Sequence, residues 1–275
     1  HASLSPCYGP GARLRNRDSV CTGGARGVYA RCTGGDAMKI AMWSGPRNLS
    51  TAMMYAFGNR SDCAVVDEPF YAAYLAKTGL DHPMSNQILA AQPHDPQVVA
   101  EALSGPNPDG KTHWYQKHMT QHMIAGVPRL WMRDVTNVFL IRHPARVIAS
   151  YAAKRENPSL DDIGFRQQAE LYQEVQSFGG NPVVIDSHDI RENPRAMLEK
   201  LCDAIGLDFD PAMLTWPEGG HKDDGVWAPH WYSAVWNSTG FAGAEGPLPV
   251  LEGSAASLCE EALPYYLQMA PHALK

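Results

Sequence analysis

The sequence predicts an α/β protein in which helices cover both faces of a central parallel sheet, giving three layers. Short apolar runs that end in polar or turn residues alternate along the chain with segments in which apolar residues recur at helical spacing. Parallel strands need crossover connections, which are usually helices, so this alternation is typical of a parallel sheet. The chain of 275 residues is long enough to bury a substantial core, and it shows no internal repeat.

Five runs have the length and composition of strands, and the regions between them fit helices. The run Val138–Ile141 is apolar throughout, as expected for a central strand that is buried on both faces. The expected strands are 40–43, 63–66, 112–117, 138–141 and 183–186. The expected helices are 52–57, 70–76, 98–103, 144–151, 161–178, 194–205 and 254–269, with a helical turn at 121–125 and an irregular stretch at 79–110.

The composition argues against several classes of protein. Hydrophobic residues make up 44% of the chain and charged residues 19%, which is typical of a globular protein in water. No apolar run approaches the roughly 20 residues that a membrane helix needs, so we expect no membrane partner and a cytoplasmic location. The formal net charge of -6 argues against nucleic acid as a general partner. An anion site must therefore be a local concentration of arginine and lysine.

The cysteines show no metal-binding pattern. None of the six belongs to a C-x-x-C pair or to a set with metal-spaced histidines. We therefore expect free thiols in a reducing compartment and no metal site.

Residues 1–37 differ in composition from the rest of the sequence. They hold five arginines against two acids, Gly-Gly pairs interrupt them, and no apolar periodicity appears. Met38 directly precedes the first strand, so we expect 1–37 to be a non-native or disordered leader and 38–275 to be a single domain. An Arg-rich targeting peptide is the alternative, because no apolar stretch typical of a secretory signal is present.

The first candidate site lies between Lys39 and the helix start, where a strand and a tight loop precede the helix. The loop reads Gly45, Pro46, Arg47, Asn48, Leu49, Ser50 and Thr51. Free amides of the first helical turn, the positive end of the helix dipole and the Arg47 guanidinium would together favour an anion. Asn48, Ser50 and Thr51 occupy positions typical of N-caps and first-turn hydroxyls. The loop is not a Walker A motif, because the second glycine and the lysine are missing; an ordinary turn with a surface arginine is the alternative.

A second candidate site follows the central strand. Pro144 begins a helix, which puts Ser150 on its second turn, eight residues after Arg142 at the strand end. An arginine at the strand end and a serine on the helix can converge on one anion.

Polar residues also end the second and third strands. Asp67 and Glu68 follow one strand, and Lys117 and His118 follow the other, at the sheet edge where open α/β folds collect functional groups. A polar loop without a function is the alternative for the acids. A lone histidine is more often structural than catalytic, which is our interpretation of His122 as well as His113.

Both arginine motifs resemble those of the sulfotransferase family. Pro46 and Arg47, followed by the hydroxyl pair at 50 and 51, are similar to the loop that holds the 5′-phosphosulfate of the donor, and Arg142 with Ser150 resembles the element that holds its 3′-phosphate. The resemblance covers most of residues 38–240 in element order. It implies a P-loop NTPase-like sulfotransferase fold, in which a sulfuryl group passes from 3′-phosphoadenosine 5′-phosphosulfate (PAPS) to a hydroxyl or amine of a small-molecule acceptor, without a metal.

The resemblance also implies roles for single residues. Residues 45–51 with Arg142 and Ser150 would bind the donor, and Arg47 would in addition stabilise the leaving phosphate. Lys222, in the charged loop 216–225, would close over the nucleotide, although acids at 223 and 224 oppose this role. Ala52 stands where cytosolic members of the family carry a tryptophan that stacks on adenine, so the adenine contact must come from elsewhere.

Two groups compete for the role of the base that takes the proton of the acceptor. Glu68 in Asp-Glu-Pro-Phe resembles the Glu-Pro element of carbohydrate and bacterial sulfotransferases. Lys117 and His118 resemble the strand-end lysine and histidine of the cytosolic enzymes, where one residue separates the two. Adjacent residues point to opposite faces of a strand, which favours Glu68.

Two other functions remain open from the sequence. A P-loop kinase or nucleotide hydrolase would need Mg²⁺ held by a Walker lysine and hydroxyl, and that lysine is absent. A non-catalytic binding module for the 3′,5′-bisphosphate product (PAP) is the third interpretation. We expect a monomer or a homodimer.

Removal of residues 1–37 tests the assignment of the leader. A chain that begins at Met38 should keep the thermal midpoint and the donor affinity of the full chain, because these residues show no pattern that predicts packing. Thermal unfolding and calorimetry check this, and failure of the shortened chain to fold would assign residues 1–37 to the domain.

Overall fold

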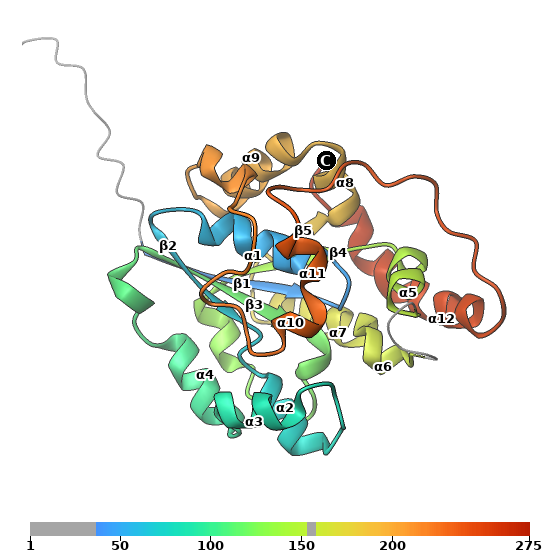
Figure 1. The fold of residues 1–275 in the computed structure, drawn as a ribbon, viewed down its shortest axis with the longest axis horizontal. Helices are drawn as coiled ribbons and strands as arrows, with labels where there is room; N and C mark the ends of the chain where they lie inside the picture. Colours follow the sequence, from blue (N-terminus) through green and yellow to red (C-terminus); the bar gives the residue numbers. More distant parts are fainter. Residues whose placement is uncertain (1–36, 153–157) are drawn as a thin grey trace, which may run out of the picture. The chain divides into compact units, whose positions relative to one another are not determined.

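Five parallel strands form one sheet, which confirms the predicted α/β class (Figure 1). The computed structural model describes residues 37–152 and 158–275. The predicted leader, residues 1–37, lies outside the described residues apart from its last position. The order across the sheet is β2-β3-β1-β4-β5, and every neighbouring pair is parallel. The strands are β1 (Met38–Ser44), β2 (Cys63–Asp67), β3 (His113–Met119), β4 (Thr136–Ile141) and β5 (Val183–Asp186).

The strand order brings the carboxyl ends of β1, β3 and β4 side by side. β1 is central, with β3 and β2 on one side of it and β4 and β5 on the other. The chain therefore adds strands first on one side of β1 and later on the other. In open parallel sheets, the point where the strand order reverses in this way leaves a crevice beyond the carboxyl ends of the strands, where ligands bind. The segments 45–49, 120–122 and 142–143 follow these three strands and therefore meet at one edge of the sheet.

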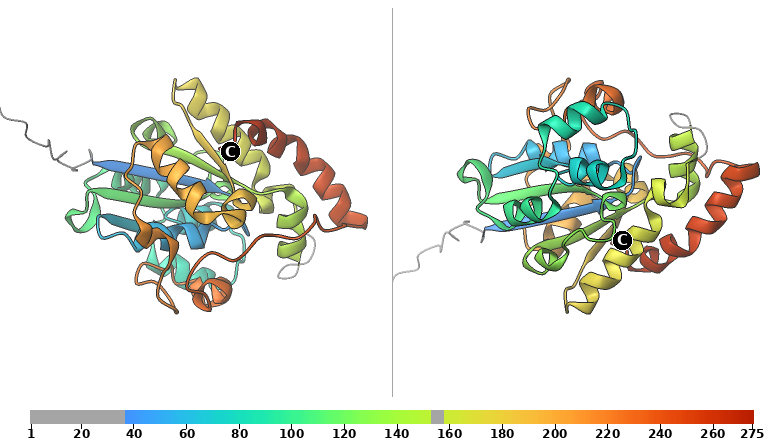
Figure 2. Two further views of the ribbon diagram at one scale, coloured as in Figure 1. Left: turned by 90° about the horizontal axis from the view of Figure 1, so that it is seen from above. Right: turned by 90° about the horizontal axis from the view of Figure 1, so that it is seen from below.

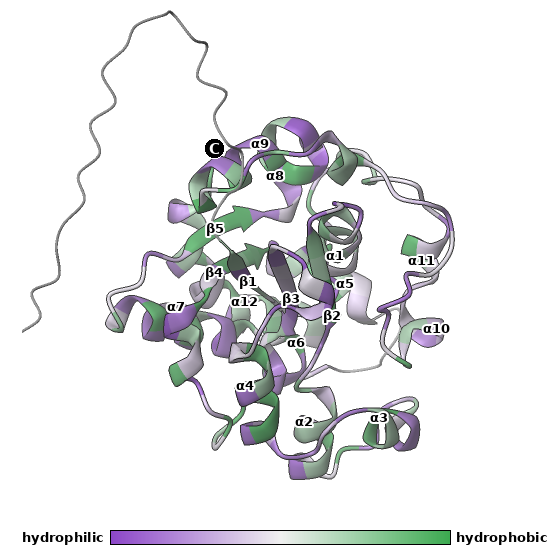
Figure 3. Cartoon of the chain, turned by 90° about the vertical axis from the view of Figure 1, so that its left-hand side faces the viewer, coloured by the Kyte–Doolittle hydropathy of each residue, from purple (hydrophilic) through white to green (hydrophobic). Residues whose placement is uncertain are grey.

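Helices cover both faces of the sheet, and an apolar cluster lies on each face (Figure 2). The α-helices of the described residues are α1 (Ser50–Gly58), α2 (Tyr71–Thr78), α3 (Ser85–Ala91), α4 (Pro96–Ser104), α5 (Pro144–Ala152), α6 (Leu160–Ile163), α7 (Phe165–Ser177), α8 (Ser187–Glu192), α9 (Pro194–Ile205), α10 (Ala228–Trp231), α11 (Ser233–Trp236) and α12 (Gly253–Met269). Helices α1, α8 and α9 contribute to one cluster, and α4, α7 and the end of α12 contribute to the other. The apolar character of β4 and β5 is visible in Figure 3, and their residues from Val138 to Ile141 and at Ile185 are fully buried.

Several helices differ from the sequence-based expectation. The prediction of a single helix at 161–178 is wrong, because Gly164 separates α6 from α7. Gly164 has a φ of 70°, which residues with a side chain rarely adopt. A Cβ there would also lie 2.6 Å from Thr120 Oγ1, which is too close, so both the backbone conformation and the packing require glycine. The irregular stretch at 79–110 holds α3 besides the expected α4. The short helices α8, α10 and α11 were also missed, since none is long enough to show a helical period.

Buried amides tie together the carboxyl ends of β1 and β4. Gln168 Nε2 on α7 donates to the carbonyl oxygens of Trp43 (3.1 Å) and Leu140 (2.9 Å). Asn48 Nδ2, in the loop after β1, donates to the same Leu140 carbonyl (2.6 Å). Because buried polar groups must be paired, these bonds fix the loop relative to both strands.

Within the described residues, no helix combines the length and the apolar character required to cross a membrane. Cys63, Cys202 and Cys259 are free thiols, as expected.

Candidate active site

The loop between β1 and α1 presents the amino end of the helix to a cavity. Arg47 and Leu49 have φ values of 58° and 62°, a left-handed conformation that residues with side chains rarely adopt. Strain of this kind persists where the surroundings enforce it, and it is concentrated at functional sites. The amide of Met53 donates to the Leu49 carbonyl (3.1 Å), so the amides of the preceding first turn are left for a ligand.

Asn48 and Gly45 hold this loop in place. The N-cap of α1 is Leu49, and no side chain caps the helix. The expected N-cap position of Asn48 is wrong, because Asn48 lies one residue earlier and its Nδ2 donates to the Leu140 carbonyl. A Cβ on Gly45 would lie 2.5 Å from the carbonyl oxygen of Ile163, so only glycine permits this approach of α6.

The structure brings the two arginine motifs together. Arg47 Nε donates to Ser150 Oγ (3.0 Å), and Arg142 donates from its guanidinium to the carbonyl of Arg47 (2.5 Å). Burial and the positive charge of Arg142 lower the pKa of Arg47. Two neighbouring guanidinium groups repel each other, and a bound anion would relieve that repulsion.

A cavity of about 610 Å³ lies over this edge of the sheet. Most of the predicted site residues line it, namely Pro46, Arg47, Asn48, Leu49, Ser50, Thr51, Glu68, Lys117, Arg142 and Ser150. Three predicted site residues are not part of the lining: Gly45, His118 and Lys222. A larger cavity of about 920 Å³ shares Gln121 with this one but contains none of the predicted residues, so the smaller cavity is the candidate site.

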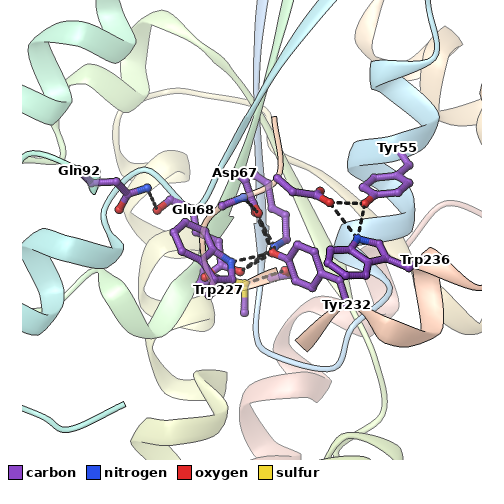
Figure 4. Close-up of polar contacts among 12 residues, drawn as sticks. Tyr55, Asp67, Glu68, Gln92, Trp227, Tyr232 and Trp236 are labelled. Carbon is purple, nitrogen blue, oxygen red and sulfur yellow. Dashed lines mark hydrogen bonds and ion pairs between the residues drawn. The ribbon is translucent and has the colours of Figure 1, made fainter. Parts of the chain in front are cut away.

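Lys117 is the centre of a buried polar network at the cavity. Figure 4 shows Asp67, Glu68 and Tyr232, which belong to it. Lys117 Nζ donates to Asp67 Oδ1 (2.8 Å), Glu68 Oε1 (2.6 Å) and the Tyr232 hydroxyl (2.6 Å). These three acceptors use all three protons of the ammonium group. The Tyr232 hydroxyl also accepts from Trp227 Nε1 (2.9 Å), and its single proton can go to Asp67 (2.8 Å) or to Glu68 (3.2 Å).

Burial and charge determine how this network titrates. Burial raises the pKa of Glu68; the positive charge of Lys117 opposes the shift and Asp67 adds to it. Burial would lower the pKa of Lys117, but the carboxylates of Asp67 and Glu68 raise it, so the ammonium form persists. Burial and the same two carboxylates raise the pKa of Tyr232 well above its usual value, which keeps the phenol protonated.

The backbone of Glu68 is held in a strained conformation. Its φ is 41°, and three hydrogen bonds surround it: its amide donates to the Lys117 carbonyl (3.0 Å), and its carbonyl accepts from the Tyr71 amide (3.0 Å) and from Gln92 Nε2 (3.2 Å). These contacts fix the direction in which the carboxylate leaves the strand end.

His118 lies on the opposite face of β3 from Lys117. Its ring stacks on Trp43 with centroids 4.4 Å apart, and Phe70 and Trp131 lie at 5.9 Å and 5.2 Å. Burial lowers the pKa of His118 to about 3. Alternation along the strand turns His118 into the core and away from the cavity, so the structure does not bring it together with Lys117 and Glu68.

Lys222 lies outside the cavity as well. Its side chain is 73% exposed and pairs with Asp223 (3.0 Å) and, more distantly, with Asp109 (4.0 Å). In this structure the ammonium group lies at the surface, and the expected role of Lys222 over a nucleotide stays a prediction.

The cavity contains residues that the sequence analysis did not select. His122, interpreted as structural, lines the cavity and stacks on Tyr71 with centroids 4.5 Å apart. Arg191 lines it from α8, and Tyr232 from the segment after α10. The aromatic cluster around Tyr232 was the one sequence signal that could have indicated this residue. No local pattern in the sequence indicated that His122 or Arg191 lines the cavity. In the described part of the chain, no group of three or more His, Cys, Asp or Glu side chains could hold a metal ion.

Replacement of Lys117 by methionine tests the network. Removing the cation leaves two buried carboxylates without a counter-charge, so Lys117→Met should lower the free energy of unfolding by about 3 to 5 kcal/mol in urea titrations. Lys111→Met is the matched control, because Lys111 Nζ makes one exposed hydrogen bond, to the Ser61 carbonyl, and it should change stability by less than about 0.5 kcal/mol. Equal effects of the two changes would contradict the structural role of Lys117.

Comparison with known proteins bears on the identity of this domain. Two proteins of Arabidopsis thaliana, "Branched-chain-amino-acid aminotransferase-like protein 2" and "Branched-chain-amino-acid aminotransferase-like protein 1", are 34% and 35% identical over 228 and 234 residues. The matches cover 82% and 85% of this chain but 40% and 42% of the relatives, so the chain spans about two fifths of their length.

Solved structures with a similar arrangement include "Sulfotransferase Domain from the Curacin Biosynthetic Pathway", with a TM-score of 0.48, 16% identity and coverage of 81% of this chain and 96% of that one. "Sulfotransferase Domain from the Synechococcus PCC 7002 Olefin Synthase" gives a TM-score of 0.46 and 18% identity, covering 83% and 96%. A family model described as "Sulfotransferase domain" matches residues 38–273, nearly the whole described chain. The chain belongs to the sulfotransferase domain family.

Proposed function

We propose that this domain transfers a sulfuryl group from PAPS to a hydroxyl or amine of a small-molecule acceptor. The observation that carries the proposal is the presence, in one cavity, of a helix amino end with two linked arginines and of a strained, buried carboxylate. The first arrangement suits phosphate groups, and the second suits proton removal from an acceptor.

The residues present fit a donor with two separate phosphate groups. The first turn of α1 with Arg47 would hold the 5′-phosphosulfate, and Arg142 with Ser150 would hold the 3′-phosphate. Arg47 and Arg142 supply forked guanidinium donors that match phosphate oxygens, and both line the cavity. Bound there, the donor supplies a sulfuryl group attached to a phosphate that can leave.

Glu68 is the group proposed to take the proton of the acceptor. The polar contacts of its carboxylate fall on Oε1 among the described residues, which leaves Oε2 for an acceptor proton. The side chain is 10% exposed and lines the cavity, so the oxygen is accessible from it. A buried carboxylate with a raised pKa is a stronger base than an ordinary one, which suits this role.

Lys117 and Tyr232 are proposed as positioning residues. Both bind Oε1 of Glu68, and the lysine has no proton left for another acceptor unless one of its three contacts opens. They orient the carboxylate and keep it ionised until the proton arrives. Arg47 and the loop amides would stabilise the charge that develops on the phosphate oxygen.

The acceptor is proposed to enter past Tyr71, His122 and Trp231, which line the cavity together with Glu68. A cavity of about 610 Å³ is within the range for a small molecule. Aromatic walls favour a flat or apolar body that carries the reacting hydroxyl or amine at one end.

Replacement of Glu68 by glutamine should separate binding from proton transfer. Glu68→Gln keeps the shape of the side chain, so PAP affinity measured by calorimetry should change little, while kcat should fall about 100-fold or more. In the unmodified enzyme, kcat should fall as the pH drops through the raised pKa of Glu68, because only the carboxylate can accept a proton. That acid limb should be absent from the residual activity of the variant.

The control for this experiment is His118→Phe, which preserves an aromatic ring in the core. It should leave the acid limb in place, because His118 lies outside the cavity. Full activity of Glu68→Gln together with loss of turnover in His118→Phe would refute the assignment of the base.

Replacement of Arg142 by alanine tests the donor. PAP binding should weaken by about 2 to 4 kcal/mol in calorimetry, the range for losing one side of a buried charged contact. Adenosine 5′-phosphosulfate, which lacks the 3′-phosphate, should bind both proteins alike. Equal losses for the two ligands would show that Arg142 does not bind the 3′-phosphate.

A further inference from the structure

A single carboxylate from a surface loop is buried among three arginines next to the cavity. Glu245 contacts the guanidinium groups of Arg142, Arg146 (3.3 Å) and Arg191 (2.9 Å), and its contact with Arg142 is very short. The Glu245 side chain is 4% exposed, whereas the residues on either side of it in the loop are exposed. Such burial of a charge is stable only because it is paired.

The loop that carries Glu245, residues 241–252, has no helix or strand of its own and runs between α11 and α12 (Figure 1). We call it the strap. Arg191 Nε donates to the Gly243 carbonyl (2.8 Å), and Arg146 donates to the Gly246 carbonyl (2.6 Å). The same arginines that bind the carboxylate therefore hold the backbone on both sides of it.

The charges of this cluster do not balance. Three guanidinium groups face one carboxylate, which leaves an excess of positive charge. The charges of the three arginines lower the pKa of Glu245 although burial would raise it, so the carboxylate stays ionised. A phosphate monoester carries close to two negative charges at neutral pH and offers three acceptor oxygens to forked guanidinium donors, so it matches the three arginines better than a carboxylate does.

On the basis of the function proposed above, we propose that Arg142, Arg146 and Arg191 form the subsite for the 3′-phosphate of the donor and that Glu245 is its internal occupant, which the phosphate displaces together with the strap. Arg142 and Arg191 line the cavity, so a ligand in it reaches the same guanidinium groups that Glu245 holds. Donor binding is then an exchange of one anion for another. The apparent affinity is reduced by the fraction of molecules in which the strap is closed.

Glu245→Gln removes the competing charge and keeps the shape of the side chain. In calorimetry, the variant should bind PAP about tenfold more tightly than the unmodified protein, because the closed strap is less populated. Adenosine 5′-phosphosulfate, which lacks the 3′-phosphate, should gain less than about twofold. Glu252→Gln, a change to an exposed acid of the same strap, is the matched control and should alter neither affinity.

Hydrogen exchange gives a second measurement on the unmodified protein. Saturation with PAP should raise deuterium uptake in residues 241–252, whereas an ordinary lid would become protected by its ligand. Unchanged or lower uptake, or equal PAP affinities of the unmodified protein and Glu245→Gln, would overturn the proposal on the strap and leave the proposed function standing.

Inorganic phosphate distinguishes failure of the strap from failure of the proposed function. If PAP binds neither protein, the proposed donor is wrong, and a phosphate titration by calorimetry still decides the role of Glu245. Tighter phosphate binding by Glu245→Gln than by Glu252→Gln supports displacement of an internal anion, and equal binding refutes it.

Discussion

The buried ammonium group of Lys117 is the constraint on which the rest of the site depends. A lysine that is 1% exposed is stable as a cation only where acceptors use its protons and carboxylates balance its charge. Asp67 is placed opposite Lys117 in the register between β2 and β3, which makes one of these contacts a product of strand pairing. Glu68 and Tyr232 complete the set. Glu68, the catalytic carboxylate that we propose, is therefore held in position because the buried charge of Lys117 must be neutralised.

The fold and the loop 45–51 at the cavity could be predicted because their signals are local. Apolar runs indicated the strands, and short motifs around Arg47 and Arg142 indicated which loops meet at the cavity. Sequence alone could not indicate Tyr232, which lies 115 residues from Lys117, or Glu245, which lies 103 residues from Arg142. Those partners are selected by packing of an irregular C-terminal segment, and no periodic pattern describes such packing.

Two histidines show the same limit at close range. His118 and His122 lie four positions apart, yet the strand turns the first into an aromatic core and the following 3₁₀ turn, Thr120–His122, brings the second to the cavity. Residue type could not distinguish them, because both are buried and both stack on aromatic rings. The face of the strand determines the direction of His118, and the turn that follows determines that of His122.

The contact of Tyr232 with the strand ends has a consequence for how the protein folds. Asp67 and Tyr232 are 165 residues apart, so their hydrogen bond closes one of the longest loops in the chain. Closing so long a loop costs more chain entropy than closing a short one, and folds rich in such contacts form more slowly. During synthesis, a nascent chain that has not yet reached Tyr232 contains the whole loop 45–51 but leaves the Lys117 ammonium group without one of its three acceptors. The surroundings of Glu68, the base that we propose, are therefore incomplete until Tyr232 has been synthesised.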